Sequence, residues 1–274
     1  MKIGVVTWTL GSADPATVFA KAQALGLDAI QYAGDFNDCS GAELQRQALA
    51  ANVALLAIDP FNAGPAQPEE ATEQGAIDYY RTLVDFAVDA GHVPITLQGL
   101  AQWTRNCPDR TRARERLLAC CKAVDAYARE KGVRTLYEVC NHYEVPLIVT
   151  ADDCRELIDQ VGSDNLRMIL DSFHMNIDER DPLDTIRRHA ALTAIYHISD
   201  SGRGGIGSGH IDFGAQHDAL VEAGFNGDVA VELVLKHNTP SSPPANEEDA
   251  HLLDEQITRS AAAWRGYADS RARA

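Results

Sequence analysis

Four side chains that could bind a metal ion occur at or near the ends of apolar segments in the second half of the sequence. They are Glu138 after Thr-Leu-Tyr, Asp171 after Met-Ile-Leu, His197 within Ala-Ile-Tyr-His-Ile, and Glu232 after Val-Ala-Val. Each alone could be a salt-bridged carboxylate or a satisfied core histidine. Together, in apolar surroundings, they would repel one another and lose solvation unless a cation lay among them. Three oxygens and one nitrogen, without a thiolate, favour Mn²⁺, Mg²⁺ or Co²⁺, with Zn²⁺ as an alternative.

The segments that must position these residues alternate between short apolar runs and amphipathic stretches. We predict strands at 5–8, 29–32, 53–58, 93–97, 133–139, 166–170, 194–198 and 229–233, and helices at 15–25, 40–51, 69–90, 108–131, 150–161, 182–189, 215–223 and 249–267. Asp14, Ser40 and Thr150 are predicted helix N-caps. Eight alternations without a composition break predict an α/β fold, one (β/α)8 TIM barrel over residues 1–274. The carboxyl ends of its strands would bring the four candidate ligands together.

Composition restricts the partners of this barrel. A formal net charge of −16 opposes binding to nucleic acid, because every phosphate would meet a repulsive field. No apolar run approaches the length of a membrane span, and the first residues do not resemble a signal peptide. The six cysteines form no C-x-x-C pair, which predicts reduced thiols and a cytoplasmic location. A small neutral or cation-bound ligand fits this composition best.

Further polar residues follow the predicted ligands at short intervals. Glu144 lies six residues after Glu138, His174 three after Asp171, and Arg203 six after His197. Arg203 belongs to the glycine-rich stretch 202–209, which invites interpretation as a phosphate-binding loop. This stretch lacks the strand–GxxxxGK[ST]–helix context of such loops, so we expect it to let Arg203 approach a ligand closely.

At these residues the sequence resembles the xylose isomerase-like TIM-barrel superfamily of sugar and sugar-phosphate isomerases and epimerases, and within it the D-tagatose 3-epimerase/D-psicose 3-epimerase group. Separations of 33, 26 and 35 residues between the four predicted ligands are similar to those of the epimerases. The matching motifs are Glu138-Val-Cys-Asn141-His-Tyr-Glu144, Asp171-Ser-Phe-His174-Met-Asn-Ile-Asp-Glu179, His197-Ile-Ser-Asp-Ser-Gly-Arg203 with Gly207-x-Gly209, and Glu232.

The resemblance implies a role for each of these residues. Glu138, Asp171, His197 and Glu232 would bind one divalent metal ion, Mn²⁺ foremost, and Glu138 and Glu232 would also be the catalytic acid/base pair. Glu144, His174 and Arg203 would bind the substrate, a sugar or sugar phosphate. The reaction would be epimerisation of a ketose at C3 through an enediolate, and the family's members are commonly homodimers or homotetramers.

Two departures from the family pattern leave the identity of the sugar open. Gln31 stands where many relatives carry an acidic residue, and Glu232 is followed by Leu-Val rather than a small residue and Phe. Aldose–ketose or hydroxypyruvate-type isomerisation could use the same site, as could an inosose or dehydroshikimate dehydratase. A silent sugar-binding barrel is a further alternative. An abasic-site endonuclease would need more histidine ligands and a basic face, which the charge of −16 opposes.

Overall fold

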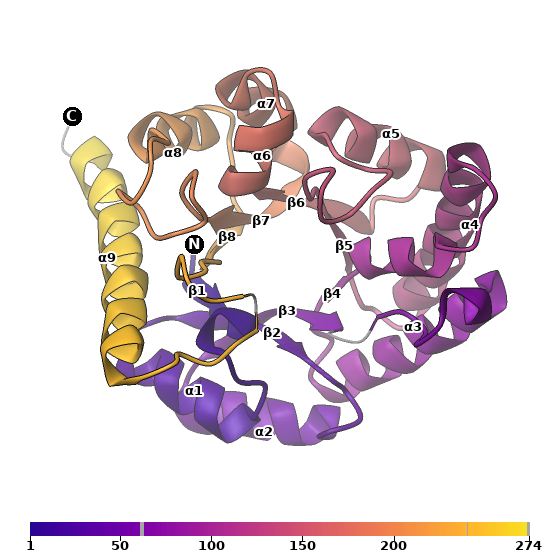
Figure 1. Cartoon of the computed structure of the whole chain (residues 1–274), viewed down its shortest axis with the longest axis horizontal. Coiled ribbons are helices and arrows are strands. Elements are labelled where there is room, and N and C mark those ends of the chain that lie inside the picture. The colour runs from indigo at the N-terminus through magenta and orange to yellow at the C-terminus, as the bar shows by residue number, and fades with distance from the viewer. Residues whose placement is uncertain (61–62, 240, 273–274) are drawn as a thin grey trace.

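The computed structural model describes residues 1–60, 63–239 and 241–272, and its eight parallel strands form a closed barrel in sequence order. Strand β1 closes the barrel by pairing with β8. Figure 1 shows the strands around the centre and the helices outside them. The predicted TIM barrel is thereby confirmed. The strands are β1 (Ile3–Val6), β2 (Ala29–Gly34), β3 (Ala54–Pro60), β4 (Ile95–Thr96), β5 (Thr135–Glu138), β6 (Leu166–Asp171), β7 (Thr193–Ile198) and β8 (Asp228–Val231).

All but the last of the described α-helices lie between successive strands, and polar side chains mark where several of them begin. Asp14, Ser40 and Thr150 each accept a hydrogen bond from a backbone N–H in the first turn of the following helix, so these three predicted N-caps are confirmed. The helices are α1 (Pro15–Ala24), α2 (Gly41–Ala51), α3 (Glu73–Asp89), α4 (Arg110–Glu130), α5 (Ala151–Val161), α6 (Ser172–Asp178), α7 (Pro182–His189), α8 (Phe213–Glu222) and α9 (Glu247–Ala272).

Several predicted boundaries were wrong, and two of the differences affect the candidate site. Trp8 is not in the first strand, because Thr7–Leu10 forms a 3₁₀ turn that ends at the left-handed residue Gly11. Glu232 lies one residue beyond β8 rather than inside it. Farther away, the helix predicted from residue 69 begins at Glu73, after a separate short turn.

Helix α6 was not predicted, and it follows β6 without a loop. Asp171 is both the last residue of β6 and the N-cap of α6, since its carboxylate accepts a hydrogen bond from the His174 backbone N–H. One turn of helix therefore fixes the position of His174 relative to Asp171.

Two apolar layers pack on the two faces of the barrel's sheet. Small and branched side chains fill its interior, and a larger set packs between the strands and the helices. The interior layer leaves the carboxyl ends of the strands to polar residues, as is usual in this fold. The six cysteines are free, and no helix within the described ranges is long and apolar enough to cross a membrane. The interior layer consists of Val6, Ala29, Ala33, Leu56, Ala57, Leu136, Ile169, Ile195 and Ala230.

Candidate active site

The four predicted metal ligands meet at the carboxyl ends of β5 to β8. Strand register places Asp171 directly beside His197. The Nδ1 atom of His197 lies 3.3 Å from Glu138 Oε1, 3.2 Å from Glu232 Oε2 and 3.9 Å from Asp171 Oδ2. All four side chains are buried, with Asp171 and His197 at 0% exposure. The structure thus brings them into one cluster around a single imidazole nitrogen.

Gln31 of β2 determines which nitrogen of His197 faces this cluster. Its Oε1 lies 2.9 Å from His197 Nε2, and a carbonyl oxygen can only accept, so Nε2 carries the proton. In the neutral imidazole the lone pair on Nδ1 then points toward the three carboxylates. Neither Nδ1 nor the nearby Glu232 Oε2 has a hydrogen-bond partner within the described residues. Two buried polar atoms directed at the same point fit a cation between them.

Negative charge dominates the electrostatics of the cluster. Burial disfavours charge on His197, but the carboxylates of Glu232 and Glu138 outweigh it and hold the pKa of His197 well above its ordinary value. Burial likewise opposes charge on Glu232, yet His197 and Arg203 lower the pKa of Glu232. Burial raises the pKa of Asp171 to about 7, and the nearby His174 only partly offsets this effect. The buried carboxyl groups of the cluster can therefore all be ionised only if a positive charge compensates them.

His174 is also close enough to be considered a ligand. Glu138, Asp171, His174 and Glu232 each offer one ligand atom, and these atoms lie within 4.8 Å of one another. Asn141, however, directs its side-chain amide nitrogen to His174 Nδ1 at 2.7 Å, and the Asn141 oxygen is occupied by the Tyr143 backbone N–H. Neutral His174 therefore carries its proton on Nε2, which lies 3.8 Å from Glu138 Oε1. This tautomer suits donation to an oxygen better than binding to a metal.

Arg203 and Glu144 form an ion pair beside the cluster, with 2.5 Å between Nη1 and Oε1. The Arg203 guanidinium lies over the rings of Trp8 and Phe173, at 5.4 and 5.0 Å from their centroids. Burial raises the pKa of Glu144, but Arg203 outweighs this and lowers it. Arg203 is held in place while its Nε remains without a hydrogen-bond partner among the described residues.

In the glycine-rich stretch, backbone N–H groups that could bind a phosphate donate instead to the carboxylate of one residue, Asp200. Asp200 is fully buried and accepts hydrogen bonds from the backbone N–H groups of Ser201, Gly207, Gly209 and Ile211. These N–H groups are the kind that a phosphate-binding loop would offer to its ligand. The loop instead positions Arg203, whose φ of 63° lies in the left-handed region.

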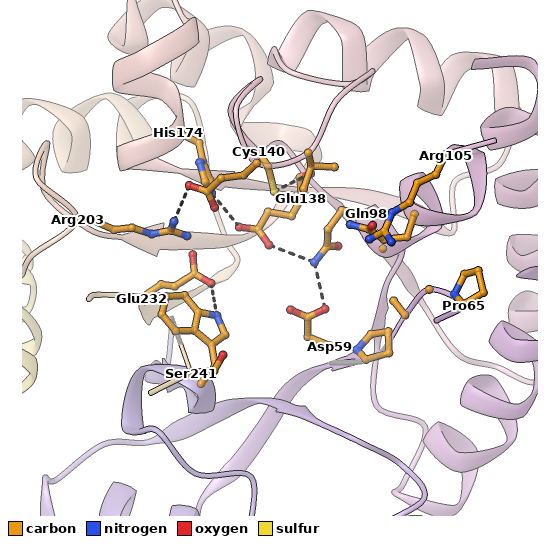
Figure 2. Close-up of a pocket in the computed structure, with 18 residues that line it drawn as sticks. Asp59, Pro65, Gln98, Arg105, Glu138, Cys140, His174, Arg203, Glu232 and Ser241 are labelled. Carbon is orange, nitrogen blue, oxygen red and sulfur yellow. Dashed lines mark hydrogen bonds and ion pairs between the residues drawn. The ribbon is translucent and has the colours of Figure 1, made fainter. Parts of the chain in front are cut away.

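A cavity of about 480 Å³ opens above the cluster, a size suited to a small molecule. Glu138, Glu144, His174, Arg203 and Glu232 all line it. Figure 2 shows Glu138 and Glu232 entering from two sides, with Arg203 near Glu232. Asp171 and His197 are fully buried. All seven predicted residues thus belong to the cluster or to the cavity walls.

Other residues that line the cavity were not predicted from the sequence as part of the site. Trp8 donates its indole N–H to Glu232 Oε1 at 3.0 Å, across 224 residues of sequence. Asp59 of β3 and Gln98, just after β4, lie on the opposite wall from Arg203 (Figure 2). No local pattern marks such long-range partners. The only local signal was their position at the ends of predicted strands.

Residues 19–256 match the family described as "Xylose isomerase-like TIM barrel". The chain belongs to this family. The sequence is 35% identical to an L-ribulose 3-epimerase of Mesorhizobium japonicum over 146 residues, which are 53% of this chain and 44% of the relative. It is 26% identical to a D-psicose 3-epimerase of Agrobacterium fabrum over 225 residues, which are 79% of this chain and 78% of the relative.

Solved structures of this family share the whole fold. A D-psicose 3-epimerase with D-tagatose, from Clostridium cellulolyticum H10, superposes with a TM-score of 0.83 at 23% identity, covering 97% of this chain and 99% of the other. At this identity the likeness establishes the barrel, not the reaction. The sequence alignments with the first curated relatives span less than half of each relative's length.

Proposed function

We propose that this protein is a divalent-metal-dependent ketose 3-epimerase with Glu138 and Glu232 as its acid/base pair. One observation carries the proposal: the two carboxylates come from separate strands, both line the cavity, and both approach His197 Nδ1, at 3.3 and 3.2 Å. Relatives named as 3-epimerases of L-ribulose and D-psicose support the same reaction class.

The metal ion would be bound by Glu138, Asp171, His197 and Glu232, because their side chains direct three oxygens and one imidazole nitrogen toward the same point. Mn²⁺ suits this donor set, with Mg²⁺, Co²⁺ and Zn²⁺ as alternatives. When bound, the ion would supply Lewis-acid polarisation of the ketose carbonyl and hold the substrate in place.

The two glutamates would move the proton. One carboxylate removes the proton from C3, next to the carbonyl carbon, and the electron pair of the C–H bond enters an enediolate. The other glutamate, in its carboxylic acid form, donates its own proton to the opposite face of C3 and becomes a carboxylate, which inverts that centre. Each glutamate is held by a neutral donor at one oxygen, Trp8 at Glu232 Oε1 and Gln98 at Glu138 Oε2. The second oxygen of each is thereby aimed at the cluster.

His174, Glu144 and Arg203 would orient the substrate. The Nε2–H of neutral His174 can donate to a substrate oxygen, and Arg203 can donate to the oxygen that becomes negative in the enediolate. Glu144 holds Arg203 in position and can accept from a substrate hydroxyl. Such groups contribute by restricting the substrate to a reactive pose and by stabilising developing charge.

The experiment is incubation of Mn²⁺-loaded protein with D-fructose, D-psicose, D-tagatose and L-ribulose in D₂O, followed by NMR. Deuterium at C3 of an inverted product supports the epimerase. Deuterium at C1 or C2 with formation of an aldose would instead establish an isomerase, since the same pair could return the proton to the adjacent carbon. Loss of water would establish a dehydratase. No exchange with any ketose would refute the enediolate chemistry.

A further inference from the structure

The indole of Trp8 contacts two charged groups of the candidate site at once. Its N–H donates to Glu232 Oε1 at 3.0 Å. The Arg203 guanidinium lies over its ring, with Cζ 5.4 Å from the ring centroid. Trp8 also lines the cavity that both groups face. One side chain therefore contacts a member of the proposed acid/base pair with its edge and the neighbouring cation with its face.

Two parts of the chain hold the turn that carries Trp8. The preceding strand β1 pairs with β8, the strand that leads into Glu232. After Trp8 the turn ends at Gly11, whose φ is 66°, and a Cβ atom at Gly11 would lie 2.3 Å from Pro243 Cα. The turn thus lies between the closure of the barrel and the segment that follows β8. The backbone on both sides therefore places the indole against Glu232.

The contact with Trp8 leaves one oxygen of Glu232 for chemistry. Oε1 accepts from the indole N–H, whereas Oε2 lies 3.2 Å from His197 Nδ1 and has no hydrogen-bond partner among the described residues. A carboxylate that is hydrogen-bonded at one oxygen is restricted in its rotation, so the direction of its other oxygen is fixed.

Arg203 is attracted to Glu232 and yet does not pair with it. Burial opposes the charge on Arg203, but the carboxylate of Glu232 outweighs burial and raises the pKa of Arg203. Arg203 Nη1 nevertheless pairs with Glu144, at 2.5 Å. In the part of the chain that the structure describes, no ion pair joins Arg203 to Glu232, and Figure 2 draws none between them. Because opposite charges attract strongly in a partly buried site, another contact must keep these two apart.

Trp8 supplies that contact on both sides. It gives Glu232 Oε1 a neutral donor in place of the guanidinium, and it gives the guanidinium an aromatic face in place of the carboxylate. A direct ion pair between Arg203 and Glu232 would occupy the acceptor that removes a substrate proton and the donors that face the substrate. With Trp8 between them, both groups remain available.

We propose that Trp8 is a positioning residue that keeps Glu232 and Arg203 apart, so that Glu232 can transfer a proton while Arg203 binds the substrate. The inference rests on the proposed epimerase function. It gives the first strand–helix unit of the barrel, in which no site residue was predicted, a part in orienting the acid/base pair. An indole has a single N–H, which here serves Glu232, so its loss should impair proton transfer at one face of the enediolate only.

Trp8→Phe tests the N–H contact, because it keeps an aromatic face for Arg203 and removes the donor. The Mn²⁺-loaded variant is incubated in D₂O with each member of an epimer pair in turn, and NMR follows inversion and deuterium at C3 of the remaining substrate. We expect kcat to fall on the order of 10-fold, the effect of one lost hydrogen bond to a charged group.

The ratio of substrate exchange to inversion should change from one epimer alone. From the epimer that Glu138 deprotonates, the enediolate waits for Glu232, so Glu138 has time to exchange its proton with solvent and return deuterium to the same face. The ratio should therefore rise. From the other epimer Glu232 acts first, and a slower first step leaves the ratio as it is in the unmodified protein.

Two further variants separate the edge of the indole from its face. The amide nitrogen in Trp8→Gln is as many bonds from Cβ as the indole nitrogen, so this variant can still donate to Glu232 but lacks the ring beside Arg203. It should keep the unmodified ratio and raise KM. Trp264→Phe is the matched control, because Trp264 is fully buried and its indole N–H has no hydrogen-bond partner within the described residues. It should keep both the ratio and KM.

Equal changes of the ratio from both epimers, an unaltered ratio from both, or an unaltered kcat in Trp8→Phe would each overturn the inference. An unaltered KM in Trp8→Gln would overturn the role of the ring. If Trp8→Phe does not fold, Trp8→Leu, which also lacks the donor, makes the same comparison. If the unmodified protein exchanges no ketose, the proposed function itself fails, which is distinct from an unaltered ratio in an active enzyme.

Discussion

The two walls of the cavity are built in different ways. The wall from β5 to β8 places its polar residues at strand ends, buried around His197 Nδ1, where three carboxylates surround one imidazole. The opposite wall, which we call the distal wall, carries Asp59 and Gln98. Asp59 Oδ1 accepts hydrogen bonds from Thr96 and Gln98, and the buried Gln98 Oε1 lacks a donor within the described residues. The first wall suits reacting atoms, whereas the second suits the non-reacting end of a substrate. Changes in the first should therefore affect turnover, and changes in the second should affect substrate choice.

The largest effect is expected for the acid/base pair. Glu138→Gln and Glu232→Gln keep the size of each side chain but remove its ability to carry a proton, which should lower kcat roughly 10²- to 10⁴-fold for every ketose. Steady-state kinetics with two sugars would measure this. Glu255→Gln, an exposed carboxylate on α9, is the matched control and should be fully active. Near-normal turnover in either site variant would remove that residue from proton transfer.

The two histidines of the candidate site, His174 and His197, should separate metal binding from substrate binding. His197→Asn should greatly weaken Mn²⁺ binding measured by calorimetry, and Gln31→Leu should weaken it about 10- to 100-fold, because Gln31 orients the His197 ring. His174→Asn should leave Mn²⁺ affinity unchanged while it lowers turnover. If His174→Asn instead abolished Mn²⁺ binding, His174 would be the nitrogen ligand and the tautomer assignment would be wrong.

A smaller effect is expected at Arg203. Arg203→Lys keeps the charge but loses the planar group that lies over Trp8 and Phe173 and pairs with Glu144. We expect kcat/KM to fall on the order of 10-fold, because the substitution removes about one hydrogen bond to a charged group. The affinity for Mn²⁺ should not change. An unaltered kcat/KM would show that Arg203 does not contact the substrate.

The smallest effect concerns the framework that supports both walls. Thr150→Ala removes the N-cap of α5, and the free energy of unfolding should fall by about 1 kcal/mol. In a protein of this size the Tm should drop by roughly 2–4 °C, measurable by calorimetry. Substrate preference and kcat should not change. A changed preference would mean that the walls are not independent of the helix framework.

The β5–β8 wall could be predicted from sequence for a specific reason. Each of its residues ends or nearly ends a buried apolar segment, and the barrel brings consecutive strand ends together. Glu138, Asp171, His197 and Glu232 therefore followed from local pattern and fold class. The alternation of segments likewise predicted the barrel itself, which the structure confirms.

The rest of the site depends on contacts that local sequence does not encode. Asp59 follows the strand predicted at 53–58, yet it is the sixth residue of β3 and accepts a hydrogen bond from Gln98 across 39 positions. Helix α6 was not predicted because Asp171 both ends β6 and is the N-cap of α6, so no loop separates the two elements. Trp8 contacts Glu232 only because β1 closes the barrel against β8.

The most direct test of the central claim is the early time course of deuterium incorporation in D₂O, read by NMR in substrate and product separately. Two glutamates on opposite faces of the enediolate predict that the C3 epimer formed first carries deuterium while the remaining substrate carries almost none. Product that forms without deuterium, or substrate that exchanges without any inverted product, would contradict proton transfer between Glu138 and Glu232.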